Sequence, residues 1–168
     1  MSLHAQDFFK NYLEPGGEFD GEKFYIMRGE QNITSTPWVD PVGEEAKFGT
    51  YNVSKQRTIK MDVQIKGNPF VKVAPTTRVL KIVENTENKI LLKIMTITNS
   101  VPYSDCFGVE EEWLIASLPG TKCCVFRVAL VIRWFKSTMM KSIIKSSTDG
   151  EAGKTCAAFK QWLVDNGH

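Results

Sequence analysis

The residues best suited to chemistry lie in one short stretch, residues 101–113, which reads VPYSDCFGVEEEW. It places Cys106 beside Asp105, and three glutamates follow at residues 110–112. A thiol becomes a nucleophile when a base stands beside it, and paired carboxylates can perform general acid–base catalysis. The stretch therefore raises the question of whether the protein is an enzyme or only binds something.

The histidines argue against nucleophilic and zinc catalysis. There are two, His4 and His168, and both lie close to the chain ends, where order is usually poorest. A Ser-His-Asp or Cys-His site needs a histidine held rigidly beside its nucleophile, and a catalytic zinc site usually includes at least one. The sequence has no phosphate-binding or dinucleotide-binding glycine motif either. Acid–base chemistry stays open but no pattern favours it, so we expect a protein that is not an enzyme and carries neither metal nor cofactor.

The four cysteines, Cys106, Cys123, Cys124 and Cys156, show no metal-type spacing. Cys123 and Cys124 are neighbours in a predicted strand, so their side chains point to opposite faces. Cys106 has no evident base beside it, and we interpret it as a structural thiol. Reduced thiols of a cytosolic protein are the simplest reading.

The composition indicates one globular domain. The chain has 168 residues, of which 42% are hydrophobic and 24% charged. A net charge of +2 is too small for a nucleic-acid binder, whose pI usually exceeds about 9. No apolar run approaches the roughly 20 residues that span a bilayer, and no secretory signal precedes the domain. We expect a monomeric, cytosolic single domain over residues 1–168, belonging to a longer multidomain protein.

The apolar pattern predicts an α+β fold. Ile59, Met61, Val63 and Ile65 alternate with polar residues, which is typical of a strand with one buried face. Polar turns join further strands into hairpins, and a C-terminal helix follows. A curved antiparallel sheet wrapped around that helix buries one face of each and can enclose a cavity. The predicted elements are a helix over 3–13, strands over 36–39, 56–65, 77–84, 89–98, 107–117 and 123–135, and a helix from about 139.

The C-terminal helix has small residues in its middle. Two of them, Gly150 and Gly153, each cost about 1 kcal/mol relative to alanine within a helix. One explanation is a break or kink near Asp149 and Gly150. The other is that a continuous helix uses Ser146, Ser147 and the two glycines to leave open space beneath it.

The connection at residues 66–77, KGNPFVKVAPTT, is longer than a hairpin requires. It carries three apolar residues, Phe70, Val71 and Val73, which are costly to leave in water. Lys66 and Lys72 suit an anionic membrane surface. We expect this loop to cover a cavity or insert into a membrane; the alternative is a loop packed on its own domain.

Residues 101–107, VPYSDCF, with Val109, Glu110 and Trp113, resemble the VPYGDYF-x-VE-x-x-W segment of VASt domains. These are the StAR-related lipid-transfer-like domains of the Lam and Aster sterol transporters and of plant GRAM-domain proteins. The likeness covers residues 34–165, including FKSTM at 135–139. The chain departs from the pattern at Ser104, where glycine is usual, and at Cys106, which replaces an aromatic residue.

The resemblance implies a helix-grip (StART-like) fold that holds one sterol-sized lipid between the sheet and the terminal helix. It makes the 66–77 loop the gating lid, with membrane contact through Lys66, Pro69, Phe70, Val71, Lys72 and Val73. It gives Pro102, Tyr103, Asp105 and Phe107 a structural role. It places the domain at membranes of the endoplasmic reticulum or its contact sites, through other parts of the full-length protein.

Apolar strand faces and the terminal helix are the expected cavity lining: Ile59, Met61, Val63, Phe126, Val128, Leu130, Ile132, Ile144 and Ser147. Glu111 shares a strand face with Val109 and Trp113, so it could orient a ligand. The competing interpretation is a solvent-facing Glu111 paired with Arg127.

Three functions remain open at this point. The favoured one is a non-enzymatic lipid carrier for a sterol or a similar lipid. The second is a protein-interaction or membrane-tethering module with the same fold, which would have a cavity filled by large side chains. The third, a cyclase or isomerase, requires polar groups converging inside the cavity, and the sequence reveals none.

Overall fold

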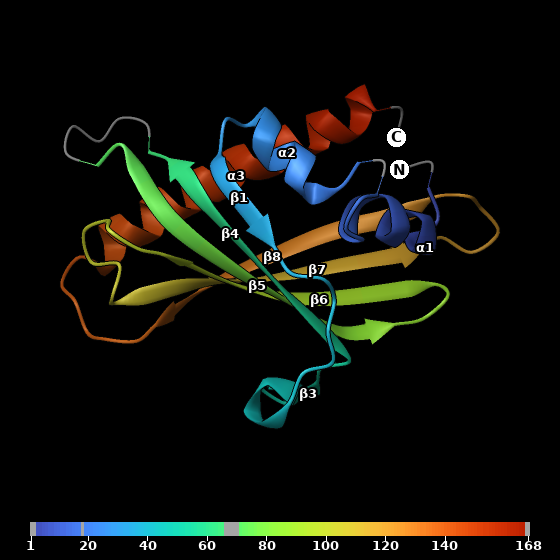
Figure 1. Cartoon of the computed structure of the whole chain (residues 1–168), viewed down its shortest axis with the longest axis horizontal. Helices are drawn as coiled ribbons and strands as arrows, with labels where there is room; N and C mark the ends of the chain where they lie inside the picture. The colour runs from blue at the N-terminus through green and yellow to red at the C-terminus, as the bar shows by residue number, and fades with distance from the viewer. Residues whose placement is uncertain (1–2, 18, 66–70, 167–168) are drawn as a thin grey trace.

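The computed structural model describes residues 3–17, 19–65 and 71–166. A six-stranded antiparallel sheet lies against one long C-terminal helix, α3, Lys141–Asp165. Figure 1 shows α3 running along one face of the sheet, with α1 and α2 beside its C-terminal half. The predicted helix-grip α+β fold is confirmed.

The strands of the sheet lie in the order β1-β4-β5-β6-β7-β8. From β4 to β8 each strand pairs with the next one in the chain, and the one exception is β1, which pairs with β4. Two long hairpins, β5–β6 and β7–β8, form its centre and one edge, as the alternation of apolar residues predicts. A separate two-stranded sheet pairs β2, Lys47–Phe48, with β3, Tyr51–Asn52. The main strands are β1 Gln31–Ser35, β4 Lys55–Gln64, β5 Val73–Asn85, β6 Lys89–Thr98, β7 Phe107–Ser117 and β8 Cys124–Trp134.

The N-terminal third holds more structure than its sequence indicates. Helix α1, Ala5–Phe8, continues into the π-helix η1, Phe9–Leu13, which together form the predicted first helix. Helix α2, Gly21–Met27, β1 and the short 3-10 helix η2, Gly43–Ala46, were not predicted. The strand predicted at 36–39 is wrong, since these residues form only an isolated bridge between Val39 and Gln56.

Helix α2 forms because Asp20 caps it. The Asp20 carboxylate accepts hydrogen bonds from the amides of Glu22 (3.1 Å) and Gly16 (2.8 Å), which satisfies a helix donor and fixes the preceding turn. The helix then buries Phe24 and Tyr25 against the sheet. It spans about two turns, too short for its apolar period to be read from sequence.

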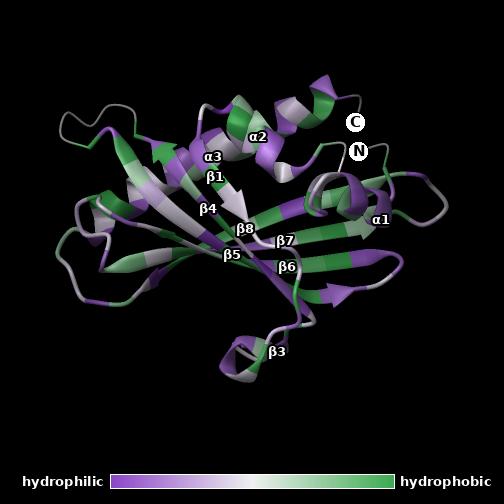
Figure 2. Ribbon diagram, viewed as in Figure 1, coloured by the Kyte–Doolittle hydropathy of each residue, from purple (hydrophilic) through white to green (hydrophobic). Residues whose placement is uncertain are grey.

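An aromatic cluster closes one end of the space between sheet and helix. The rings of Phe24 and Phe159 lie 5.1 Å apart, and those of Tyr12 and Trp162 lie 5.5 Å apart. These edge-to-face contacts join η1, α2 and α3. Figure 2 shows hydrophobic segments along β6, β7 and β8 beside α1, where this core lies.

Helix α3 is continuous, so of the two explanations of its small residues, the break near Asp149 and Gly150 is wrong. A Cβ atom added to Gly150 or Gly153 would meet no other atom within 4 Å, but both glycines are exposed. The space beside them is therefore open to solvent and does not indicate a cavity beneath the helix. Beyond them, Ile144 is buried at the far end of the helix.

The turn before β7 is bonded to the loop between β8 and α3. Asp105 forms an ion pair with Lys136 (2.7 Å), and the amide of Phe135 donates to the carbonyl of Cys106 (2.8 Å). Tyr103 takes the left-handed backbone conformation (φ 63°), whereas Ser104, where the family pattern has glycine, does not. The motif thus fixes the turn into β7 against the β8–α3 loop.

All four cysteines are free. Cys106 is buried, and its thiol lies 3.6 Å from the Asp105 carboxylate. Burial first and the nearby carboxylate second raise the pKa of the Cys106 thiol. A thiol held in its protonated form is a poor nucleophile, which agrees with a structural role.

Candidate functional site

Two adjoining cavities lie between the concave face of the sheet and α3. Their volumes are about 530 and 960 Å³. Both lie within the size range of small-molecule sites in proteins, roughly 300–1,000 Å³. They meet at a junction whose lining both share: Tyr25, Arg78, Glu111, Val128, Thr155 and Cys156.

The larger cavity has apolar walls beneath α3. Met61, Val63 and Leu130 line it from the sheet, and Ile144 lines it from α3. Thr148 and Ala152 of α3 are half-buried and also line it, whereas the small residues at its rim are exposed: Ser146, Ser147, Gly150 and Gly153. The side of α3 that faces the sheet therefore bounds the cavity, and the glycines do not.

The smaller cavity is aromatic and is closed at its far end by an arginine. Trp113, Phe126 and Phe159 line it. Arg57 is 2% exposed, and its Nη1 atom donates to the carbonyl of Leu13 (2.8 Å). Glu22 lies 3.4 Å from the same guanidinium and balances its charge. Arg57 thus belongs to the wall, on the concave face of β4.

A buried ion pair stands at the junction of the two cavities. The Nη2 atom of Arg78 lies 2.7 Å from Oε1 of Glu111, and the Nε1 atom of Trp113 donates to Oε2 of Glu111 (2.9 Å). Arg78 is 7% exposed. Both oxygens of the carboxylate therefore already accept hydrogen bonds from the protein.

Arg78 keeps donors that the described residues do not use. Its Nε atom is buried and has no hydrogen-bond partner in residues 3–17, 19–65 and 71–166. Its guanidinium lies over the ring of Tyr25, 5.7 Å from the ring centre. Burial lowers the pKa of Arg78, but the charge of Glu111 and the Tyr25 hydroxyl outweigh this and hold it above its ordinary value. Arg78 therefore stays charged.

Tyr25 stays protonated beside it. Burial raises the pKa of the Tyr25 hydroxyl, and the positive charge of Arg78 offsets only part of that rise. No hydrogen bond of this hydroxyl to any other described residue is formed. The Tyr25 side chain lines both cavities, so its O–H is a second donor at the junction.

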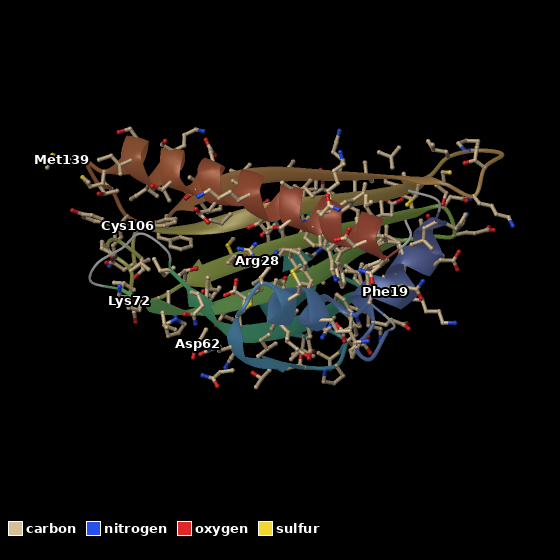
Figure 3. The ribbon with its side chains drawn as sticks, turned by 90° about the horizontal axis from the view of Figure 1, so that it is seen from above. Phe19, Arg28, Asp62, Lys72, Cys106 and Met139 are labelled. Carbon is tan, nitrogen blue, oxygen red and sulfur yellow. The ribbon has the colours of Figure 1, made fainter. Side chains whose placement is uncertain are left out.

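A second arginine ties α2 to α3 at the same place. The Nη1 atom of Arg28 donates to Oγ1 of Thr155 (2.5 Å), and its Nε atom lies 3.5 Å from Glu30. Figure 3 shows Arg28 in the space between the sheet and α3. This contact fixes the helix above the junction.

Most of the expected lining residues border one of the two cavities. Ile59 and Phe126 line the smaller one, and Val128 lines both. Ile132 shares the strand face of Leu130 but lies outside the described lining. The larger cavity takes the remaining expected residues: Met61, Val63, Leu130, Ile144 and Ser147.

The predicted pairing of Glu111 with Arg127 is wrong. Glu111 points into the concave side and pairs with Arg78, while Arg127 lies 3.7 Å from Glu112 on the opposite face. Arg78 was missed as a site residue. The signal for it was present, because Thr76, Arg78, Leu80 and Ile82 fall on one face of a strand, and an arginine on an apolar face needs a buried partner.

The expected lid is shorter than its sequence indicates, since β5 begins at Val73 and the residues up to Thr77 pair with β4. Val71 is half-buried and Lys72 exposed, and the carbonyl of Lys72 accepts from the amide of Ile65 (2.9 Å). Figure 3 places Lys72, Cys106 and Met139 at one end of the molecule. The other expected lid residues, Lys66, Pro69 and Phe70, lie outside the described residues.

Among the residues that the structure describes, no cluster of His, Cys, Asp and Glu is arranged to hold a metal ion. Within the same ranges, none of the helices has the length and apolarity needed to cross a membrane.

The sequence matches the VASt family, described as the VAD1 Analog of StAR-related lipid transfer domain, over residues 1–150. Comparison with curated proteins gives no match. The matched region includes α1 and α2, which the resemblance over residues 34–165 left out. It also covers the whole six-stranded sheet and the N-terminal part of α3. Lipid binding or transfer is the general function of such a domain, and an apolar space between sheet and helix suits it. The chain belongs to the VASt family of StAR-related lipid-transfer domains.

Proposed function

We propose that the protein carries one sterol in the space between the sheet and α3 and exchanges it with membranes, without catalysing a reaction. The observation that carries the proposal is the cavity of about 960 Å³ between the sheet and α3, which Met61, Val63, Leu130 and Ile144 line with apolar side chains. Apolar surface in contact with water is unfavourable, so a hydrophobic ligand would be stabilised in this space.

The lining suits a mostly apolar ligand with one polar end. Met61, Val63 and Leu130 offer apolar contact, and a buried charged pair, Arg78 and Glu111, lies at the junction. Ligand pockets in general combine such walls with a few polar groups that orient the ligand. A sterol, with a rigid hydrocarbon body and a single hydroxyl, fits this distribution.

Exchange with a membrane is proposed to take place at the end of the molecule where Met139 lies. Met139 is 99% exposed, and Phe135 and Ile143 near it are more than half exposed. Residues 101–103 line the larger cavity, and Figure 3 shows Lys72 at the same end as Met139. The exposed Lys72 and Lys141 supply positive charge, worth on the order of 1 kcal/mol each close to an anionic surface.

Gating belongs to the same proposal. The β4–β5 connection, whose described members Val71, Lys72 and Val73 lie at this end, would move aside as the lipid passes. The domain would reach the cytosolic surface of the endoplasmic reticulum or its contact sites through other parts of a longer protein.

The converging polar groups do not favour a cyclase or isomerase. Both oxygens of Glu111 already accept hydrogen bonds from Arg78 and Trp113, so the carboxylate serves as a fixed partner of these two side chains. The raised pKa of Tyr25 makes its hydroxyl a weak acid and keeps it from acting as a base. Binding explains these groups better than proton transfer does.

The test mixes purified protein with dehydroergosterol, a fluorescent sterol, and follows binding and transfer between donor and acceptor liposomes. Saturable binding of one sterol per chain, with transfer that scales with protein concentration, supports the proposal. A protein-interaction module of the same fold would show neither. Absence of saturable binding would overturn the proposed function.

A further inference from the structure

The turn that joins β6 to β7, residues 99–106, forms part of the rim of the larger cavity. Pro102 and Tyr103 line that cavity and are also exposed to solvent. A side chain that borders both a cavity and the solvent lies at an opening. Figure 3 places Cys106, the last residue of the turn, at the end of the molecule where Met139 lies. The turn therefore bounds an opening of the cavity at the proposed membrane end.

The turn contains two residues in a backbone conformation that side chains disfavour. Ser100 and Tyr103 both have a φ of 63°, in the left-handed region, although neither is glycine. Such residues cost free energy and persist only where other contacts hold them. Inside the turn, the amide of Ser104 donates to the carbonyl of Val101 (3.1 Å), and that of Cys106 donates to the carbonyl of Tyr103 (2.9 Å). The turn is therefore strained and depends on contacts that keep it in place.

An exposed ion pair fastens the turn to the loop between β8 and α3. The Asp105 carboxylate lies 2.7 Å from Nζ of Lys136, and the two side chains are 65% and 62% exposed. The amide of Phe135 donates to the carbonyl of Cys106 (2.8 Å), which fixes the end of the turn next to β7. An exposed ion pair contributes little to stability and is weakened by competing charges. The side-chain contact can therefore be exchanged while the backbone contact remains.

A negatively charged membrane competes for the lysine of this pair. Lys136 precedes Met139 by three residues, and the exposed Lys72 and Lys141 add positive charge at the same end. Close to an anionic surface, Lys136 gains a second negative partner, whereas the Asp105 carboxylate is repelled. Both effects weaken the pair at the place where a lipid would enter or leave.

We propose that the Asp105–Lys136 ion pair is a latch on the cavity rim, which an anionic membrane opens. Lys136 passes from the Asp105 carboxylate to a negatively charged lipid headgroup, and the strained turn relaxes away from the opening. This inference rests on the proposed exchange of lipid at membranes. It adds a means by which the cavity stays closed in solution and opens at a charged surface.

Hydrogen exchange of the turn tests the latch without any sterol. The reporters are the amides of Ser104 and Cys106, whose hydrogen bonds lie inside the turn. In buffer, Asp105→Asn and Lys136→Gln should each speed their exchange by up to about fivefold, the factor that an exposed ion pair can contribute. The unmodified chain should show a similar rise with vesicles of phosphatidylcholine and phosphatidylserine, but not with phosphatidylcholine alone. Inorganic phosphate with the phosphatidylcholine vesicles should leave exchange at the lower rate.

Transfer of dehydroergosterol between vesicles gives the second readout. Asp105→Asn keeps Lys136 and its attraction to the membrane, so co-sedimentation with mixed vesicles should not weaken. Transfer between phosphatidylcholine vesicles should rise, and its stimulation by phosphatidylserine should fall by the same factor. Glu84→Gln is the matched control, because Glu84 forms an exposed ion pair with Lys89 at the same distance of 2.7 Å, at the other end of β6. The control should behave as the unmodified chain does.

The outcomes separate the latch from the proposed function. If the unmodified chain binds no sterol, the proposed function fails, and hydrogen exchange still decides whether the turn opens. If Asp105→Asn and Lys136→Gln exchange as slowly as the control, or if Asp105→Asn keeps the full stimulation by phosphatidylserine, the latch is overturned. If inorganic phosphate speeds exchange as much as the mixed vesicles do, the role assigned to the membrane is overturned.

Discussion

Arg78 of β5 reaches across β6 to place its Nη2 atom 2.7 Å from Oε1 of Glu111 on β7. The residue of β6 paired with Arg78 is Thr96, whose hydroxyl lies 3.5 Å from the same carboxylate oxygen. A short side chain at Thr96 leaves room for the two long ones to meet above it. The pair is the polar centre of an otherwise apolar concave face.

Glu111→Ala should destabilise the fold strongly. The change leaves the charge of Arg78 buried without its partner, and breaking such a pair typically costs about 3–5 kcal/mol of unfolding free energy. Equilibrium unfolding in urea measures the loss. Glu84→Ala is the control, because Glu84 pairs with Lys89 on the surface, where a pair contributes about 0–1 kcal/mol. Equal losses in the two variants would contradict the central role of the buried pair.

Ala152→Leu should fill part of the larger cavity without harming the helix. Ala152 is half-buried and lines this cavity, and leucine is nearly as good a helix former as alanine. Thermal unfolding should show nearly unchanged stability, while sterol affinity should fall at least tenfold. Ala157→Leu on the exposed side of α3 is the matched control and should keep its affinity. Unchanged binding in Ala152→Leu would place the ligand elsewhere.

Met139→Glu should weaken association with anionic vesicles several-fold, because it replaces an exposed apolar side chain by a negative one at the proposed membrane end. Co-sedimentation with vesicles measures it. Val131→Glu offers a matched control, since Val131 is 51% exposed on the convex face. The proposed docking end is wrong if the two substitutions have the same effect.

Lowering the pH should reduce the free energy of unfolding, because it removes the contribution of the ionised Glu112 carboxylate. A hydrogen bond from Lys93 at 2.6 Å is the largest cause that lowers the pKa of Glu112 below its ordinary value. A carboxyl with a depressed folded-state pKa stabilises the fold above its unfolded-state pKa, and this stability is lost as the pH falls through the folded-state pKa. Urea unfolding between about pH 5 and pH 3 should therefore show a steeper loss in the unmodified chain than in Glu112→Gln. Parallel pH profiles would contradict this account.

The sheet and the terminal helix could be predicted because their apolar patterns extend over many residues. Strand alternation over β4 and a hairpin turn before Lys89 depend only on local chemistry. Helix α2 and β1 were missed because each is too short to show a period. The start of β5 was missed because Pro75 suggests a loop, whereas the structure keeps it in the strand with its carbonyl accepting from Asn99 at 2.8 Å.

The polar centre of the site could be predicted only in part. Alternation places Glu111 and Arg78 on concave strand faces, but their pairing depends on strand order and register across β6. The local pattern suggested Arg127 as the partner of Glu111 instead. The strand register places Arg127 on the opposite face of the sheet, beside Glu112. Similarly, the glycines of α3 suggested either a break or a cavity, whereas the helix is continuous and both glycines are exposed.

The most direct test of the account is the stoichiometry of sterol binding to the unmodified chain and to Ala152→Leu, measured by titration with dehydroergosterol. The account predicts saturation at one sterol per chain in the first and a large loss of affinity in the second, with both proteins equally folded. Absence of saturation in the unmodified chain, or equal binding by the two, would contradict a lipid site beneath α3.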